Sequence, residues 1–113
     1  MTPAVKGAPI TLADGQPYTL APLVLGQLDR LQEDIQASTA KRADGSFPNP
    51  LHEPAVRDAM LRVVGESLRR NHPEVDDAKL RDLFDLATLT KALQTACGLS
   101  GLRELRNGDG ASP

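Results

Sequence analysis

Residues 54–73, PAVRDAMLRVVGESLRRNHP, decide the fold of this chain. Apolar side chains recur there every three or four positions, which is the spacing of one face of an α-helix. The buried face is expected to hold Val56, Ala59, Met60, Val63, Val64 and Leu68. Pro54 suits the first helical turn, Asn71 can take the left-handed closing conformation, and Pro73 prevents continuation. The pattern therefore predicts a helix over residues 54–71.

The polar face of this helix carries opposite charges four residues apart, Asp58 with Arg62 and Glu66 with Arg70. Pairs at this spacing stabilise a helix by a few tenths of a kcal/mol each. We expect both pairs to form within the helix. His72 follows the last turn, so we expect it to interact with the carbonyl end of the helix.

A second amphipathic helix is predicted upstream, over about residues 24–37. Its inward face is expected to hold Leu25, Leu28, Leu31 and Ile35. Residues 38–52, STAKRADGSFPNPLH, collect turn-forming residues without periodicity and predict a loop. The loop is longer than usual connections, which indicates either a functional or a mobile segment. Phe47 is expected to pin it to the core.

A β-hairpin is predicted further upstream, over residues 9–20. Apolar and polar residues alternate on both sides of Asp14-Gly15, a pair that can supply the positive φ angles of a tight turn. Pro17 suits an edge strand, and a lone hairpin needs helices to pack against. The inward-facing set is expected to be Ile10, Leu12, Tyr18 and Leu20.

Two short helices are predicted downstream. Asp76 is a good N-cap, and Val75 and Leu80 stand at the spacing of a hydrophobic staple around it. Thr88 looks like the start of the last helix and Gly98 like its stop. The buried residues of these helices are expected to be Leu80, Leu83, Phe84, Leu86, Leu89, Leu93, Ala96 and Cys97.

With 113 residues, the chain is long enough for one domain. The fold class that follows is mainly α: a small helical domain of about four helices with an N-terminal β-hairpin. We expect a flexible N-terminus over residues 1–8, the domain over 9–102 and a disordered tail over 103–113. No stretch approaches the about 18 consecutive apolar residues needed to cross a bilayer.

The sequence offers little support for catalysis or for a cofactor. Cys97, the single cysteine, indicates a reducing, cytosolic setting, and its place on an apolar stripe favours a buried hydrophobe over a nucleophile. His52 and His72 have no further ligands at metal-binding spacing. Asp76 and Asp77 are accounted for by the start of a helix. We therefore expect no enzyme activity, metal or cofactor.

Net charge argues against a dominant nucleic-acid surface, because 13 basic and 15 acidic residues give −2. The dyads Lys41-Arg42 and Arg69-Arg70 are isolated. Residues 76–97 invite comparison with a DNA-binding helix pair, but TLTKALQTAC carries one lysine and no arginine. Binding to nucleic acid is therefore not expected.

Leu99, Leu102 and Leu105 continue an apolar rhythm beyond Gly98. Two interpretations stay open for these leucines. They can belong to a last turn that folds back onto the core, or to an apolar patch that binds another protein. The second interpretation makes them the candidate partner-binding residues.

The order of these segments resembles the phage tail assembly chaperones of long-tailed phages and prophages. The resemblance begins with ITL at 10–12, YTLAPL at 18–23 and LGQL at 25–28, because that family opens with a short hairpin followed by a similar helix start. It continues with LRRNHP at 68–73, LRDLFDL at 80–86 and ACGLSGL at 96–102. It covers residues 9–36 and 54–102. Val24 departs from the family, which has Thr or Ser as the helix cap there.

The resemblance implies a non-enzymatic helper that binds the tape measure protein and keeps it soluble while tail tube protein polymerises around it. It places the protein in the cytoplasm of the bacterial host and outside the mature virion. Members of the family often have a longer form made by frameshifting near the end of the gene. Self-association remains open.

Two other classes of function stay open. The chain could be a structural tail or head-completion subunit that remains in the particle. It could also be a small helical DNA-binding regulator acting through residues 76–97. Both fit a small mainly helical domain.

Overall fold

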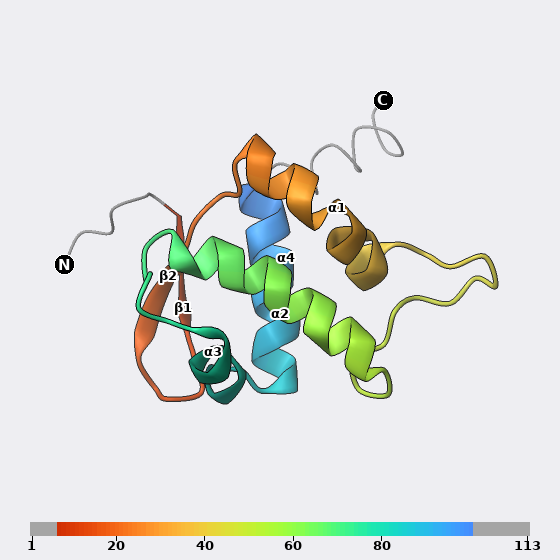
Figure 1. Ribbon diagram of the computed structural model, residues 1–113. Coiled ribbons are helices and arrows are strands. Elements are labelled where there is room, and N and C mark those ends of the chain that lie inside the picture. The colour runs from red at the N-terminus through yellow and green to blue at the C-terminus, as the bar shows by residue number, and fades with distance from the viewer. Residues whose placement is uncertain (1–6, 101–113) are drawn as a thin grey trace, which may run out of the picture.

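Helix α2 (Pro54–Arg69) lies at the centre of the fold, in a computed structural model that describes residues 7–100 (Figure 1). The other elements are β1 (Ala8–Thr11), β2 (Pro17–Leu20), α1 (Leu25–Thr39), α3 (Asp77–Leu83) and α4 (Leu86–Leu99). The strands form one antiparallel hairpin. The predicted class, a mainly helical domain of four helices with an N-terminal hairpin, is confirmed for the described residues.

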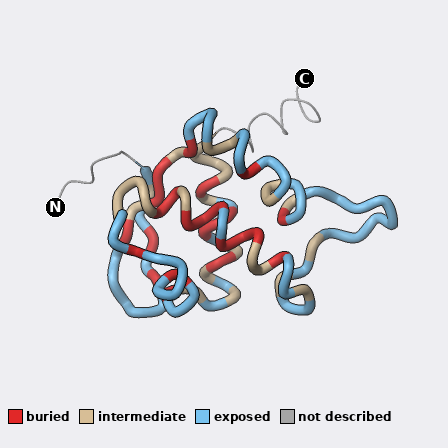
Figure 2. The backbone as a smooth tube through the Cα atoms, viewed as in Figure 1, coloured by how far each residue is buried: buried red, intermediate tan, exposed pale blue. Residues whose placement is uncertain are grey.

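Helix α2 packs against α1, α3, α4 and β2, which explains why so much of its surface is buried (Figure 2). All six residues of the predicted apolar stripe are buried, and so are Leu61, Gly65 and Ser67. The helix ends at Arg69, two residues before the predicted end. The left-handed conformation expected at Asn71 is wrong, because among residues 7–100 no residue other than glycine has a positive φ. The N–H groups of Asn71 and His72 instead donate to the carbonyl of Leu68.

The hairpin pairs Ile10 with Tyr18 and Ala8 with Leu20. Gly15 has a φ of 78°, so the expected role of the Asp14-Gly15 turn is confirmed. All four residues predicted to face inward are buried, and they join the core formed mainly by α2 and α4. The hairpin begins one residue earlier than predicted, at Ala8.

The outer edge of β2 is joined to α2 by hydrogen bonds. The N–H of Thr19 donates to Nε2 of His72 (3.0 Å), and the N–H of Ala21 donates to the carbonyl of Ser67 (3.2 Å). The Ser67 hydroxyl returns a bond to the Ala21 carbonyl at 2.6 Å. The predicted contact of His72 with the helix carbonyls is therefore corrected: its imidazole accepts from the strand, because the chain turns back after α2 and brings the ring beside β2.

Helix α1 contacts α2 alone among the elements of residues 7–100. The N–H of Val24 donates to Oε1 of Gln27 (3.0 Å). The glutamine side chain therefore satisfies the backbone N–H at the start of the helix, where Thr or Ser is absent. The helix extends to Thr39, beyond the predicted end at residue 37. Leu31 is buried, but Leu25 is exposed, which corrects its expected inward position.

The charged residues on the polar face of α2 pair with neighbouring helices and not with one another. Asp58 pairs with Arg81 of α3 and Arg69 pairs with Asp77 of α3, while the pairs of Arg62 with Asp34 and of Glu66 with Arg30 join α2 to α1. The predicted pairs within the helix are therefore wrong. The reason is that α1 and α3 bring opposite charges close to the same face, and Arg70 donates to the carbonyl of Pro22 (2.7 Å).

Helices α3 and α4 both begin at aspartate caps. The predicted cap of α3 is confirmed, since the Asp76 carboxylate accepts from the N–H of Lys79 (2.8 Å). The last helix starts before Thr88, because Asp85 accepts from the N–H of Thr88 at 2.7 Å and serves as the cap. It also passes through Gly98 to Leu99, so Gly98 is not the stop.

The remaining predictions about the chain ends fall largely outside the described residues, which exclude 1–6 and 101–113. Within residues 7–100, no helix has both the length and the apolar character required to cross a membrane. The core lies between α2, α4 and the hairpin, and α1 packs against α2 and adds Leu31 to that core (Figure 1).

Candidate partner-binding surface

The predicted partner-binding residues begin at the end of α4. Leu99 is the last residue of that helix, half-buried and packed against the hydrophobic core. Its position fits the interpretation in which the last turn folds onto the core. Leu102 and Leu105 lie outside the described residues.

Four large apolar residues of the described chain are exposed to solvent. The exposed fractions are 49% for Val24, 78% for Leu25, and 57% for both Phe47 and Leu51. They form two groups, one at the start of α1 and one in the loop between α1 and α2. Burying such a side chain in a complex is favourable by about 1.5–3 kcal/mol.

The first group lies beside the end of α4. The N–H of Leu23 donates to the Ser100 hydroxyl (2.8 Å), which in turn donates to the carbonyl of Ala96 (2.7 Å). Leu23 is itself buried, so it anchors the chain just before Val24 and Leu25 emerge into solvent. Figure 1 shows the start of α1 above the end of α4. We call Val24, Leu25 and Leu99 the α1/α4 surface.

The second group lies on a projecting loop, residues 40–53, which we call the arm (Figure 1). The Arg42 guanidinium donates to both carboxylate oxygens of Glu53 and closes the base of the arm. The same carboxylate accepts from the N–H of Asn49 (2.9 Å). The Arg42 bonds hold the pKa of Glu53 below its usual value, which favours the charged form.

The tip of the arm is a turn with Gly45 at a φ of 90°. Asp44 accepts from both the hydroxyl and the N–H of Ser46, and these bonds lower the pKa of Asp44. Phe47 follows this turn and is exposed, so its predicted role as a core anchor is wrong. The reason is that the turn and the Arg42–Glu53 pair give the arm structure of its own, without insertion of the ring into the core.

The residues weighed for chemistry are distributed over the fold. His72 is bonded to β2, His52 is exposed in the arm, and Cys97 is half-buried against the core. Among residues 7–100, no group of three or more histidine, cysteine, aspartate or glutamate residues is placed to hold a metal ion. The structure therefore brings none of these candidates together.

The two basic dyads are also separated in the fold. Arg42 closes the arm, while Arg69 donates to the carbonyl of Val75 (2.8 Å) and pairs with Asp77. Arg70 is held by the carbonyl of Pro22. Helix α4, which would have to enter a DNA groove, carries Lys91 as its single basic residue. This arrangement gives no continuous basic stripe in the described part of the chain.

Several hollows open on the surface of the described residues, and two of them adjoin the arm and the hairpin. One, of about 470 Å³, lies between the end of α1, the arm and the start of α2, and charged residues such as Glu33 and Lys41 line it. The other, of about 410 Å³, lies between β1 and the first half of α4.

Comparisons with protein families, with curated proteins and with solved structures each found no match.

Sequence reasoning missed the exposed residues of both groups. Leu25 shares the helical spacing of Leu28 and Leu31, so periodicity alone assigned it to the core. The signal that could have separated it is its place three residues after Pro22, at the very start of the helix, where no neighbouring helix is required to cover it. Leu51 lies in a segment without periodicity and therefore carried no signal.

Proposed function

We propose that this protein is a phage tail assembly chaperone, without enzyme activity, that binds the tape measure protein and keeps it soluble. Its tail tube partner polymerises around the tape measure protein, and the chaperone leaves before the virion is complete. The proposal draws on the resemblance of residues 9–36 and 54–102 to that family. It is supported by exposed aliphatic side chains on a small helical domain.

The observation that carries the proposal is the α1/α4 surface. Leu25 and Val24 are exposed although they stand in an otherwise well-packed helical fold, and Leu99 lies at the neighbouring helix end. An apolar helix laid across this surface would bury all three side chains, which is how amphipathic helices bind in grooves. The exposed Phe47 and Leu51 of the arm supply further apolar contacts.

Co-expression with the tape measure protein of the same phage tests the proposal. The fraction of tape measure protein in the supernatant should rise when this chain is present. Leu25→Glu should weaken the complex about tenfold, because the carboxylate cannot be buried and at least about 1.4 kcal/mol of apolar contact is lost. Gln32→Glu is the matched control, since it adds the same charge at another exposed position of α1.

The proposal fails if the tape measure protein is equally soluble alone, or if Leu25→Glu and Gln32→Glu preserve solubility equally well. Affinity should change little between low and high salt, since burial of apolar area is not screened. Steeply salt-dependent binding to DNA would instead favour the DNA-binding regulator. Detection of the chain in purified particles by mass spectrometry would favour the structural subunit.

A further inference from the structure

The two edges of the hairpin differ in their hydrogen bonding. On β2, the outward-facing N–H of Thr19 is bound by His72, and the N–H and carbonyl of Ala21, the residue that follows the strand, are bound by Ser67. On β1, the alternation of an antiparallel pair places Pro9 and Thr11 on the outer edge, because Ile10 and Ala8 face Tyr18 and Leu20 across the hairpin.

Three backbone groups of β1 therefore point away from the hairpin: the carbonyls of Pro9 and Thr11 and the N–H of Thr11. Among residues 7–100, no bond between elements and no side-chain bond reaches them. Pro9 has no N–H, so the edge offers one donor and two acceptors. These three groups can form the hydrogen bonds of a strand ladder if another strand lies beside β1.

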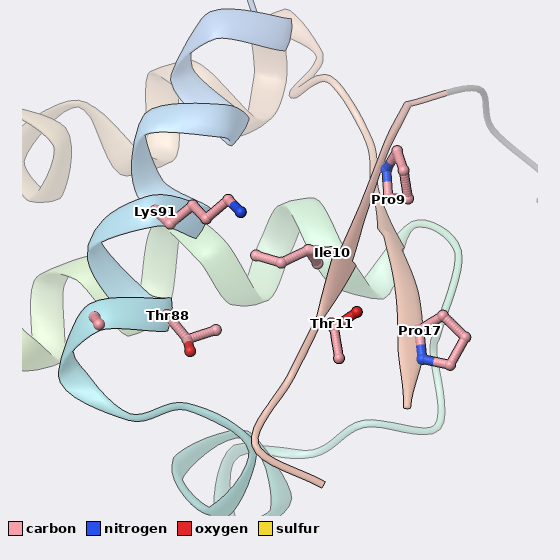
Figure 3. Close-up of a pocket in the computed structure, with 7 residues that line it drawn as sticks. Pro9, Ile10, Thr11, Pro17, Thr88 and Lys91 are labelled. Carbon is pink, nitrogen blue, oxygen red and sulfur yellow. The ribbon is translucent and has the colours of Figure 1, made fainter. Parts of the chain in front are cut away.

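The hollow of about 410 Å³ lies directly beside this edge (Figure 3). Figure 3 shows α4 facing β1 across the hollow, with Ile10 and Lys91 extending into the space between them. The lining residues are Pro9, Ile10, Thr11, Pro17, Ala87, Thr88 and Lys91. A neighbouring strand lies about 4.8 Å from its partner, so an added strand would enter this hollow.

We propose that the β1 edge accepts an extended segment of a partner protein that carries an aspartate or glutamate opposite Lys91. This site is separate from the α1/α4 surface and goes beyond the proposed chaperone function. The segment would add a third strand to the hairpin and form three backbone hydrogen bonds, accepting from the N–H of Thr11 and donating to the carbonyls of Pro9 and Thr11. Addition of a strand to an open edge is a general mode of peptide recognition.

The acidic preference follows from Lys91. Its side chain is exposed and takes part in none of the ion pairs formed within residues 7–100. An ammonium group without a carboxylate at the wall of a peptide groove selects for negative charge in the incoming segment. Ile10 supplies the apolar contact at the base of the groove.

A second copy of this chain fits the edge less well. Residues 8–12, APITL, contain no acid to meet Lys91. A symmetric pairing of two β1 strands would also place Pro9 on both sides and lose a donor from each. The occupant is therefore assigned to another protein.

The test is an NMR titration of the ¹⁵N-labelled full chain with a capped peptide of alternating valine and threonine around one glutamate. Amide signals of Ile10, Thr11, Thr88 and Lys91 should shift, and the affinity should exceed that for the same peptide with a central lysine. Thr11→Pro removes the outward N–H while sparing the hairpin bonds, and should weaken binding about threefold to tenfold. Thr11→Val retains the N–H and is the matched control.

Two further measurements keep the test independent of the proline variant. Lys91→Glu should reverse the preference, so that the lysine peptide binds more tightly. A glutamate peptide methylated on the backbone nitrogens that face β1 should bind at least threefold more weakly than its parent. These effects separate strand addition from non-specific adhesion.

Several results would overturn the assignment. These are the absence of amide shifts at millimolar peptide, equal binding of the methylated peptide, or shifts confined to the α1/α4 surface. Concentration-dependent amide shifts at Ile10 and Lys91 without peptide, abolished by Thr11→Pro, would show a second copy on the edge and also contradict it. The Leu25→Glu variant tests only the proposed chaperone function, so its loss of tape measure binding would not contradict strand addition at β1.

Discussion

Tyr18 and Asp14 are linked across the hairpin turn by a hydrogen bond of 2.7 Å, with the phenol donating to Oδ2. The other carboxylate oxygen accepts from the N–H of Gln16 (3.0 Å). Because the phenol donates to the carboxylate, the pKa of Asp14 is lowered and that of Tyr18 is raised to about 12. The edge of the tyrosine ring meets His72 at a centroid distance of 5.0 Å, so this pair also adjoins the link between β2 and α2.

The sign of each pKa shift defines its effect on stability. Stabilisation by Asp14 is present above the unfolded value of about 4 and is lost as pH falls through the lower folded pKa. Stabilisation by neutral Tyr18 is present below about 10 and is lost as pH rises through about 12. Tyr18 is the single tyrosine, so absorbance titration should give a midpoint near 12.

In the Asp14→Asn variant the tyrosine midpoint should fall towards 10, because the charge that opposes ionisation is gone. Circular dichroism at each pH is the control for alkaline unfolding. A midpoint that is the same in both proteins while they remain folded would contradict the coupling.

Substitution of Ser67 in α2 should destabilise the fold. It is fully buried, and its hydroxyl bonds the carbonyl of Ala21 on the hairpin strand. Ser67→Ala should lower the free energy of unfolding by about 1–3 kcal/mol, because the strand carbonyl loses its partner. Thr95→Ala, whose hydroxyl bonds its own helix, should change it by less than about 0.7 kcal/mol. Urea unfolding measures both, and equal effects would refute the role of Ser67.

Local chemistry at single residues could be predicted where the partner is near in sequence. Asp76 caps α3 by accepting from the N–H of Lys79, three residues away, and Gly15 lies in the turn between adjacent strands. His72 and Ser67 could not be predicted, because their partners lie 53 and 46 residues away. The sequence around a polar residue at the edge of a helix does not indicate which distant backbone group will bind it.

At the scale of the element, Gly98 shows how a helix end depends on its surroundings. A glycine near the end of an apolar pattern is a common stop, yet α4 continues through it. Helix α4 ends at Leu99, and the Ser100 hydroxyl that follows it donates to the carbonyl of Ala96 and accepts from the N–H of Leu23. A contact with a residue 77 positions away is not visible in the local sequence pattern.

Gly98→Ala should raise stability by about 0.5–1 kcal/mol, since alanine is the better helix former and no neighbouring atom of residues 7–100 lies within 4 Å of the added methyl group. Gly15→Ala is the contrasting variant. It meets no neighbour either, but its φ of +78° is strained for alanine, so its stability should fall by about 1 kcal/mol. Thermal unfolding compares them. A loss of stability in Gly98→Ala would restore the interpretation of this residue as a helix stop.

The charged residues of α2 also show which features of a helix can be predicted from its sequence and which cannot. Pairing within one helix is the natural expectation from spacing, and the existence of the helix and its apolar stripe were predicted correctly. The partners were not, because Arg30, Asp34 and Arg81 reach α2 only after three helices have packed. Periodicity defines the face of a helix that is covered, but not the residue that covers it. For the same reason Leu25 and the arm of the candidate site could not be placed from periodicity.

At the scale of the whole molecule, α1 is attached through a single neighbour. It packs on α2 and touches no other element of residues 7–100, whereas α2 is enclosed on several sides. Segments with few buried contacts open at lower free energy than the core. We expect amide hydrogens of α1 to exchange at least tenfold faster than those of α2.

Leu31→Ala should increase exchange in α1 and leave α2 almost unaffected, because Leu31 is the buried leucine of the outer helix. Hydrogen exchange followed by NMR or mass spectrometry provides the comparison. If both helices exchange with one common free energy in the original chain, α1 belongs to the same cooperative unit as the core. In that case the α1/α4 surface would be rigid.

The ion pair at the base of the arm has a practical consequence for engineering. Arg42 and Glu53 bring the two ends of this loop together independently of its tip. A foreign sequence spliced between Gly45 and Ser46 would enter and leave the chain above a closed base, so the helices on either side would not have to separate. The protein could therefore carry a fluorescent reporter at that point, and its location in living cells could be followed without a fusion at either end of the chain.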